Sequence, residues 1–471
     1  MTDTDICIIG AGSGGLSVAA GAAQMGARVV LIEGAEMGGD CLNHGCVPSK
    51  ALLAAAKHAH AMTDGARFGV APVVPQVDYA AVKDHVARTI AAIAPMDSQE
   101  RFEGFGVRVI RDWARFTAPD QMEAGGEVIR ARRFVIATGS RPAIPPVPGI
   151  EAVPYLTNET VFALREAPVH LLILGGGPIG IEMAQAHQRL GVPVTVIEGA
   201  RALGREDAEL AAIALAALRD EGVAIIEGVP VAQVAGQEGA ITLTLQDGRS
   251  LQGSHLLVAA GRKVALGRLD LAAAGVEADA RGVTVGADLR SVSNRRVYAI
   301  GDAAGGAQFT HLAGYHAGIV IRSALFGLPA KARTDHIPRV TFCDPELAQI
   351  GLTETEARAL HGDALQVLRW GFDHNDRAQA EGRTEGLVKV MVVKGRPVGA
   401  GICGPQAGEL IAPWALALSA KLRLSDMAGM VLPYPTLSEV SKRAAGAYFS
   451  PKLFDNPWVK RGVRLVQRIL P

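Results

Sequence analysis

Residues 5–15 read Asp5-Ile6-Cys7-Ile8-Ile9-Gly10-Ala11-Gly12-Ser13-Gly14-Gly15. The apolar run predicts a buried strand over 5–9, and the glycines after it have the spacing of a dinucleotide-binding turn. A helix is expected over 16–25 and a second strand over 28–32, which ends at Glu33. Glycine permits the tight turn and the close approach of a pyrophosphate, and a carboxylate at a strand tip binds ribose hydroxyls. The candidate contacts of this first nucleotide are Gly10, Gly12, Gly14, Gly15 and Glu33.

The same unit occurs a second time. A strand is expected over 169–174, a glycine turn and a helix follow, and the next strand covers 194–197. The acid lies 23 residues after the first glycine in both units, at Glu33 and at Glu198. The repeat predicts two nucleotide-binding domains of similar build. The candidate contacts of the second nucleotide are Gly175, Gly177, Gly180 and Glu198.

A carboxylate at Glu198 also predicts which nucleotide binds. It accepts hydrogen bonds from a ribose 2′-OH and repels a 2′-phosphate, which favours NADH over NADPH. Arg201 and Arg205 lie nearby in the sequence and can partly offset that repulsion.

Two cysteines, Cys41 and Cys46, are separated by four residues directly after the first unit. Residues 46–50 have the pattern of a helix start, with Pro48 in a first-turn position. A helix start lowers the pKa of a thiol, and thiol–disulfide chemistry requires a thiolate. The pair therefore indicates a redox-active disulfide, whereas a structural disulfide or two buried thiols is the alternative.

These motifs, taken in order, resemble the flavoprotein pyridine nucleotide–disulfide oxidoreductases, which include lipoamide dehydrogenase, glutathione reductase and mercuric reductase. The resemblance covers nearly the whole chain and extends to four further segments: residues 137–142 (Ala-Thr-Gly-Ser-Arg-Pro), 260–262 (Ala-Gly-Arg), 297–303 around Asp302, and 342–346 (Phe-Cys-Asp-Pro-Glu). It implies that the first nucleotide is FAD and the second is NAD. The further contacts it implies are Gly39, Lys50, Thr138, Gly139 and Asp302 for FAD and Gly261 for NAD.

The resemblance also assigns roles around the disulfide. Cys41 exchanges with substrate, Cys46 lies against the flavin ring, and Lys50 approaches the flavin and pairs with Glu182. His44 lies between the cysteines, where it is either a proton donor to a leaving thiol or an ordinary loop histidine.

The fold class expected is α/β, with two Rossmann-like FAD- and NAD-binding domains and a C-terminal α+β dimerisation domain. The boundaries predicted are 1–149 for the FAD domain, 150–268 for the NAD domain, 269–335 for a central segment that returns to the FAD domain, and 336–471 for the interface domain. Residues 372–377 read as a polar turn within the last domain. The resemblance implies a homodimer with shared active sites.

Tyr434 departs from the pattern of the family's disulfide reductases. These carry His-Pro-Thr near the C-terminus, with Glu five residues after the His, and that His is the general acid/base. Here the stretch reads Tyr434-Pro435-Thr436, and Glu439 keeps its place. A phenol titrates near ~10 and a histidine near ~6.5, so Tyr434 is a poor base at neutral pH. Tyrosine at this position resembles the mercuric reductase branch, although no cysteine pair ends this chain and no metal-binding CxxC module begins it.

The leading hypothesis is an FAD-dependent NAD(P)H oxidoreductase of mercuric reductase-like type. It passes electrons through Cys41–Cys46 to an unidentified disulfide, metal or quinone acceptor. Dihydrolipoyl dehydrogenase is the alternative enzyme. A nucleotide-binding flavoprotein subunit or redox sensor without useful turnover is the alternative of another class.

Composition excludes several classes of function. The 471 residues carry 47 Lys and Arg and 47 Asp and Glu, so no global charge attracts nucleic acid. The remaining cysteines, Cys7, Cys343 and Cys403, have no metal-ligand spacing, and Cys7 is expected to pack in a strand. No signal peptide or membrane-spanning run is found, which predicts a cytoplasmic protein.

The tail over 457–471 has interleaved apolar and basic residues at helical spacing and no acids. Such a helix can make peripheral contact with an anionic membrane or can cap the protein's own surface or a partner subunit. The packing interpretation is the expectation.

Overall fold

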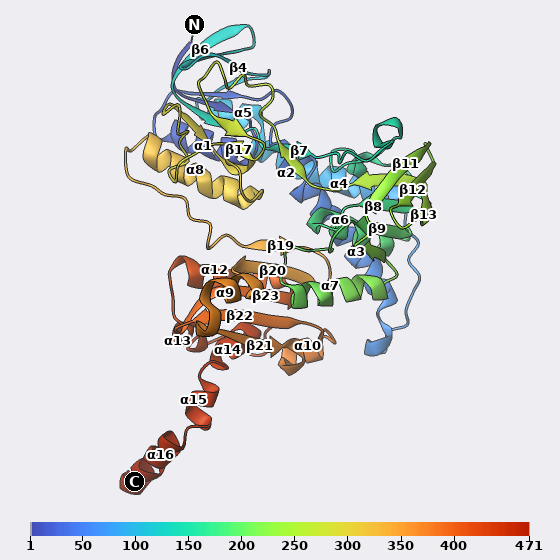
Figure 1. Cartoon of the computed structure of the whole chain (residues 1–471), viewed down its shortest axis with the longest axis vertical. Helices are drawn as coiled ribbons and strands as arrows, with labels where there is room; N and C mark the ends of the chain where they lie inside the picture. The colour runs from blue at the N-terminus through green and yellow to red at the C-terminus, as the bar shows by residue number, and fades with distance from the viewer. Residues whose placement is uncertain (1, 471) are drawn as a thin grey trace.

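The computed structural model describes residues 2–470. The first sheet has seven strands, in the order β3-β2-β1-β6-β5-β4 with β18 also paired to β6. Their bounds are Thr2–Ile9 (β1), Val29–Ile32 (β2), Arg108–Ile110 (β3), Arg115–Ala118 (β4), Gln121–Ala124 (β5), Glu127–Ile136 (β6) and Val297–Ala299 (β18). The return of β18 to β6 brings the central segment back to the first nucleotide unit. Helices α1 (Ser13–Gln24) and α8 (Thr310–Ala324) lie together against this sheet (Figure 1).

The second sheet is parallel and runs β10-β9-β8-β14. Its strands are β8 (Leu171–Leu174), β9 (Val194–Glu198), β10 (Ala224–Glu227) and β14 (His255–Val258), with helices α6 (Pro178–Arg189) and α7 (Ala208–Asp220). An antiparallel layer covers it and consists of β11 (Val231–Gln237), β12 (Ala240–Leu245) and β13 (Ser250–Gly253). A two-stranded ladder of β7 (Ser140–Pro142) and β15 (Arg262–Val264) ties this unit to the first.

The third unit is an antiparallel sheet in the order β19-β20-β23-β22-β21. The strands are β19 (Arg339–Thr341), β20 (Glu346–Gly351), β21 (Leu365–Gly371), β22 (Leu387–Val393) and β23 (Arg396–Gly404). Helices α9 (Glu354–His361), α12 (Ala412–Ser419), α13 (Leu424–Ala428) and α14 (Glu439–Gly446) pack on it, and the Trp414 indole in their core donates to Ser441 Oγ at 3.0 Å. The expected α/β class with two nucleotide folds and a C-terminal α+β unit is confirmed, while the residue boundaries of the domains stay a prediction.

The sequence suggested a polar turn over residues 372–377, and this prediction is wrong. Phe372 is fully buried, and the Asn375 side chain accepts the Ala378 N–H at 2.9 Å. An asparagine cap of this kind starts a helix. The short helix α10 (Asp376–Ala380) therefore forms here.

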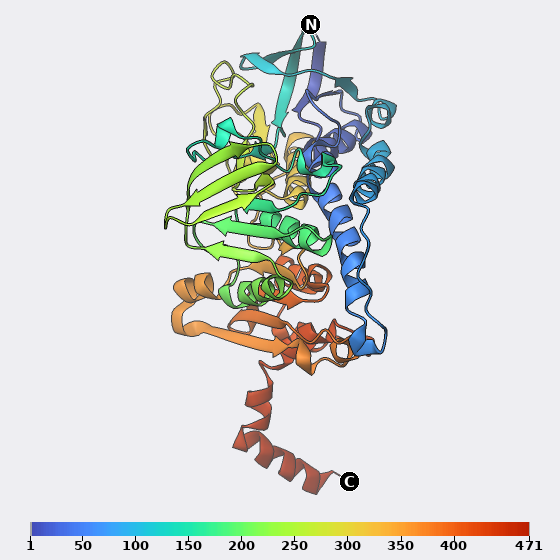
Figure 2. The same cartoon turned by 90° about the vertical axis from the view of Figure 1, so that its right-hand side faces the viewer.

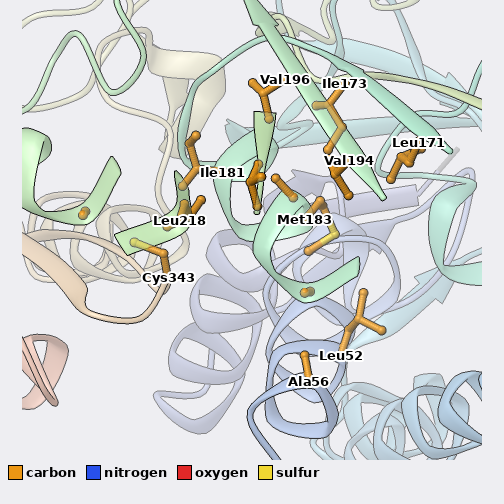
Figure 3. Packing of buried hydrophobic residues seen from close by; sticks show 14 of the residues in the cluster. Leu52, Ala56, Leu171, Ile173, Ile181, Met183, Val194, Val196, Leu218 and Cys343 are labelled. Carbon is orange, nitrogen blue, oxygen red and sulfur yellow. The ribbon is translucent and has the colours of Figure 1, made fainter. Parts of the chain in front are cut away.

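Helix α3 (Cys46–Thr63) connects the first unit to the second. Its residues Leu52 and Ala56 belong to the same apolar cluster as Ile181 and Met183 of α6 and the residues of strands β8 and β9 (Figure 3). Because α3 begins at Cys46, this packing fixes the position of that sulfur relative to both nucleotide turns.

The chain ends in α15 (Ser450–Phe454) and α16 (Pro457–Ile469), which project from the third unit away from the rest of the molecule (Figures 1 and 2). The tail does not cap its own subunit, because its apolar side chains lie exposed, whereas packing on a partner subunit stays a prediction. Among the described residues, no helix is long and apolar enough to cross a membrane.

Lys389 joins the second unit to the third. Its ammonium lies 2.9 Å from Asp207, 2.8 Å from Glu209 and 2.6 Å from Glu354, and its side chain is only 4% exposed. Asp207 also caps α7. A buried cation with three acidic partners becomes costly to remove, since the carboxylates then repel one another.

We expect Lys389→Met to lower the free energy of unfolding by about 3 kcal/mol or more. Thermal and denaturant unfolding of the purified protein measure this loss. The control is Lys263→Met, at an exposed lysine, which should leave the unfolding midpoint nearly unchanged. Equal midpoints for the two variants would contradict the structural role of Lys389.

Candidate active site

A cleft of about 2110 Å³ runs along both nucleotide units and reaches the third. Most of the residues proposed from the sequence line it: Gly10, Gly12, Gly14, Glu33, Gly39, Cys41, Cys46, Lys50, Thr138, Gly139, Gly175, Gly177, Glu182, Glu198, Gly261 and Asp302. Gly15 and Gly180 lie beneath the cleft in the helix starts. The structure therefore brings the two nucleotide motifs and the cysteine pair into one continuous space.

The two glycine turns have the same geometry. A Cβ on Gly15 would lie 1.9 Å from the Gly10 carbonyl oxygen, and one on Gly180 would lie 2.0 Å from that of Gly175. Gly10 and Gly175 adopt φ values of +105° and +117°. Only glycine allows the helix to approach the turn this closely. Each helix therefore directs its free N–H groups into the cleft, where they can bind a pyrophosphate.

The two strand-end carboxylates are also held alike. Glu33 accepts the backbone N–H groups of Ala11 and Ala35 at 2.6 and 2.7 Å. Glu198 accepts those of Gly176 and Ala200 at 2.8 and 2.9 Å. A carboxylate offers about four lone-pair sites, so each still has acceptor capacity for ribose hydroxyls.

The flavin-side residues fit a bound FAD. Thr138 Oγ1 is buried and has no hydrogen-bond partner within the protein, and the neighbouring Gly139 faces open space. An unpaired buried hydroxyl is costly, so a ligand oxygen or nitrogen at this place would stabilise the site. Asp302 accepts a 2.5 Å hydrogen bond from Ser140, and burial raises the pKa of its carboxyl.

Cys41 and Cys46 are free thiols in this structure, the reduced form of the pair. The Thr310 hydroxyl lies 3.3 Å from Cys46 Sγ. Hydrogen bonds from Cys41 and then Thr310, with the charge of Lys50, lower the pKa of Cys46 to about 6 against the opposing effect of burial. The pKa of Cys41 is raised by its hydrogen bond to Cys46 and by burial. These shifts favour a thiolate on Cys46 over one on Cys41 in the reduced pair.

Lys50 and Glu182 are paired as expected, with Nζ 2.9 Å from Oε2. The other Glu182 oxygen accepts the Phe342 N–H at 2.9 Å, and the Phe342 ring lies 4.2 Å from the ammonium. The carboxylate is thus fixed by the third unit, and it holds the ammonium within the cleft. Because Glu182 belongs to α6 and Lys50 to α3, the pair also spans the junction of the two nucleotide units.

Three residues of the site were missed by sequence reasoning: Thr310, Asn158 and Asp40. Asn158 donates to Asp40 Oδ1 at 3.0 Å and to the His44 carbonyl at 3.1 Å. Arg262, from the nicotinamide-side motif, lies 3.1 Å from Asp40. The loop between the cysteines is therefore held by residues of the second unit. No local motif marks Thr310 or Asn158, because they come from distant parts of the chain, whereas Asp40 lies directly before Cys41.

His44 and Cys7 can now be placed. The His44 ring lies 3.3 Å from the Glu36 carboxylate at the edge of the cleft. Cys7 is fully buried against Met122, with 3.4 Å between the sulfurs, and burial raises the pKa of its thiol.

Tyr434 and Glu439 are not among the described residues that line the cleft of their own chain. Tyr434 is 70% exposed, and its hydroxyl donates to Asp376 Oδ2 at 2.7 Å. This hydrogen bond and the charge of Asp376 raise the pKa of the phenol. At neutral pH Tyr434 is therefore ionised to an even smaller extent than a free tyrosine, which leaves less phenolate to accept a proton.

Comparisons with known proteins agree with this geometry. Residues 4–317 match the family model described as pyridine nucleotide-disulphide oxidoreductase, and residues 337–445 match the dimerisation domain of the same family. The chain belongs to this family. It is 33% identical over 460 residues to a mercuric reductase of Streptomyces lividans, covering 95% of this chain and 97% of that protein. It is 35% identical over 468 residues to a dihydrolipoyl dehydrogenase of Thermus scotoductus, covering 95% and 98%.

A solved structure of similar fold is the Cu(II) complex of the HOCl-induced flavoprotein disulfide reductase RclA from Escherichia coli. It has a TM-score of 0.84 and 27% identity, covering 95% of this chain and 100% of that one. The family uses FAD and a pyridine nucleotide, so the protein is an oxidoreductase, and the dimerisation domain supports a homodimer.

We expect Thr310→Val to raise the pKa of Cys46 above about 6, because the thiolate loses a donor that favours its charged form. A pH titration of thiolate absorbance in the reduced protein measures the shift. Thr63→Val, at the exposed end of α3, is the matched control and should leave the titration unchanged. An unshifted midpoint in Thr310→Val would rule out the hydroxyl as a determinant of the thiolate.

Proposed function

We propose that the protein uses NADH to reduce a thiophilic metal ion, such as Cu(II) or Hg(II), at the Cys41–Cys46 pair. The observation that carries the reductive direction is Tyr434, hydrogen-bonded to Asp376 where the family's disulfide reductases place a base. Two relatives support the acceptor class: one is named a mercuric reductase, and the other was solved as a Cu(II) complex. Thiolates are the ligands that soft metals prefer.

Bound FAD supplies the relay of two electrons between the nicotinamide and the disulfide. The residues that would hold it are the first glycine turn, Glu33, Thr138, Gly139 and Asp302. One hydride from NADH reduces the disulfide to one thiol and one thiolate and leaves NAD⁺. The lowered pKa of Cys46 and the raised pKa of Cys41 support a thiol on Cys41 and a thiolate on Cys46.

With Cu(II) as the substrate, the dithiol gives one electron to each of two ions. The products are two Cu(I) ions, the Cys41–Cys46 disulfide and one proton from Cys41. The ammonium of Lys50, held by Glu182, stabilises the Cys46 thiolate electrostatically. This reaction needs no base to take a proton from an incoming dithiol. The presence of Tyr434 in place of a histidine therefore does not impair it.

Dihydrolipoyl dehydrogenase is the second candidate, favoured by the 35% identity to the Thermus scotoductus enzyme over nearly all of both chains. An anaerobic titration separates the two. If NADH alone produces the long-wavelength absorbance of a thiolate beside an oxidised flavin, and Cu(II) or Hg(II) then discharges it, the metal reductase is supported. Rapid formation of that absorbance with dihydrolipoamide would instead support the second candidate.

In this proposal Tyr434 helps to determine whether the enzyme reduces an acceptor or oxidises a dithiol. We expect Tyr434→His to increase dihydrolipoamide oxidation about tenfold or more, since a histidine titrates near neutral pH. Asp376→Asn is the matched control: it removes the negative charge beside the phenol, but the phenol still titrates near ~10 and should give no gain. Steady-state rates with NAD⁺ at neutral pH measure both. An increase in Asp376→Asn equal to that in Tyr434→His would contradict the argument.

We also propose that NADH is preferred over NADPH, on account of Glu198. Replacing the carboxylate by an amide in Glu198→Gln removes the repulsion of a 2′-phosphate and keeps the side-chain shape. The ratio of kcat/KM for NADH to that for NADPH should fall about tenfold. Glu227→Gln is the control, since Glu227 ends the adjacent strand in register with Glu198 and does not line the cleft. A wild-type enzyme with the higher kcat/KM for NADPH would refute the preference.

A further inference from the structure

Helix α16 separates its side chains into an apolar face and a basic face. With about 100° between successive residues, the apolar side chains occupy an arc of about 160° and the basic ones the opposite side. The apolar residues are Trp458, Val459, Val463, Leu465, Val466 and Ile469, followed by Leu470. The basic residues are Lys460, Arg461, Arg464 and Arg468, and the helix contains no acidic residue.

Neither face is covered by the rest of the chain. Trp458 is 73% exposed, Leu465 60% and Ile469 72%. The preceding helix α15 adds Leu453 and Phe454, which are also exposed. Both helices lie at the end of the molecule opposite the N-terminus, beyond the third unit (Figures 1 and 2). Apolar side chains gathered on one exposed face of this kind indicate a binding surface.

Charge and size identify the surface that this helix fits. Thirteen residues at 1.5 Å each give a helix of about 20 Å, too short to cross a bilayer. A helix of this pattern lies in the plane of a membrane, with Trp, Leu and Ile in the boundary between headgroups and acyl chains. Its arginines reach outward to phosphate groups, and each cation adds to the attraction of anionic lipids. Four cations without an acid therefore match an anionic lipid surface.

A second copy of the chain matches the helix less well. The chain as a whole has 47 basic and 47 acidic residues, so another copy presents no large excess of negative charge to four cations. A groove on that copy would also have to fit the apolar face along its length, whereas a lipid surface adapts to it.

We propose that α16 docks the enzyme on anionic phospholipid membranes, with one such helix on each subunit of the dimer. The helix thereby binds the membrane peripherally and leaves the cleft and the cysteine pair in the aqueous phase. This inference is independent of the metal reductase activity proposed above.

Sedimentation of the FAD-loaded full chain with lipid vesicles tests the proposal. We expect binding to vesicles of equal phosphatidylglycerol and phosphatidylcholine, and binding at least about tenfold weaker to phosphatidylcholine alone or at high salt. Arg464→Gln with Arg468→Gln should weaken binding about 25-fold. Trp458→Ser with Ile469→Ser should abolish it. The tryptophan fluorescence of the protein should shift to shorter wavelength on addition of anionic vesicles. This shift should be absent in Trp458→Phe.

The matched control neutralises two exposed arginines of the first nucleotide unit and the central segment, Arg132→Gln with Arg281→Gln, which should leave vesicle binding unchanged. Deletion of 450–471 should remove vesicle binding and leave the molecular mass of the dimer and the rate of NADH oxidation intact. Failure of the full chain to sediment with anionic vesicles at low salt would overturn the proposal. Equal weakening of vesicle binding by the control pair would also overturn it. Conversion of the dimer to a monomer by the deletion would overturn it too, and would show that the helix binds a second copy of the chain.

Discussion

The packing of α3 on α6 is the contact on which the site depends. It places the start of α3, and with it Cys46, where the two nucleotide turns open into one cleft. The Lys50–Glu182 pair links the same two helices at the level of the sulfur. A shift of either helix would move the thiolate, its counter-ion and the second nucleotide turn together. The chemistry is therefore supported by an apolar junction between two units that each have a sheet of their own.

The electrostatics of the cysteine pair follow from this placement. Cys46 lies at a helix start, near an ammonium and a hydroxyl, and these favour its charged form. The pKa of Cys41 is raised by its hydrogen bond to Cys46, by burial and by the charge of Cys46, and these effects outweigh the hydrogen bonds from Thr310 and the Cys46 backbone. We propose that this difference between the two environments makes the two-electron reduction yield a thiolate on Cys46 and a thiol on Cys41.

The sequence predicted the parts of the site that local geometry imposes. The glycine turns and the acids at Glu33 and Glu198 could be found because a tight turn, a helix start and a strand tip have a fixed spacing along the chain. Thr310, Asn158 and Asp376 could not be found, since each reaches the site or Tyr434 from a distant segment and belongs to no local pattern. The start of α1 at Ser13, three residues earlier than expected, has a similar cause: glycines disfavour a helix on average, yet here they pack it against the turn.

Two exposed parts of the third unit are suited to different tasks. Tyr434 and Asp376 lie exposed on the unit that matches the family's dimerisation domain, so they act on chemistry only if a partner subunit's cleft faces them. Their hydrogen bond holds the phenol protonated, which suits the delivery of electrons to an acceptor and does not suit the removal of protons from a dithiol. Helix α16 extends from the same unit and has no polar link of this kind to the cleft. We therefore propose two separate roles: the exposed apolar face of α16 docks the enzyme on a membrane, and Tyr434 favours reduction of an acceptor over oxidation of a dithiol.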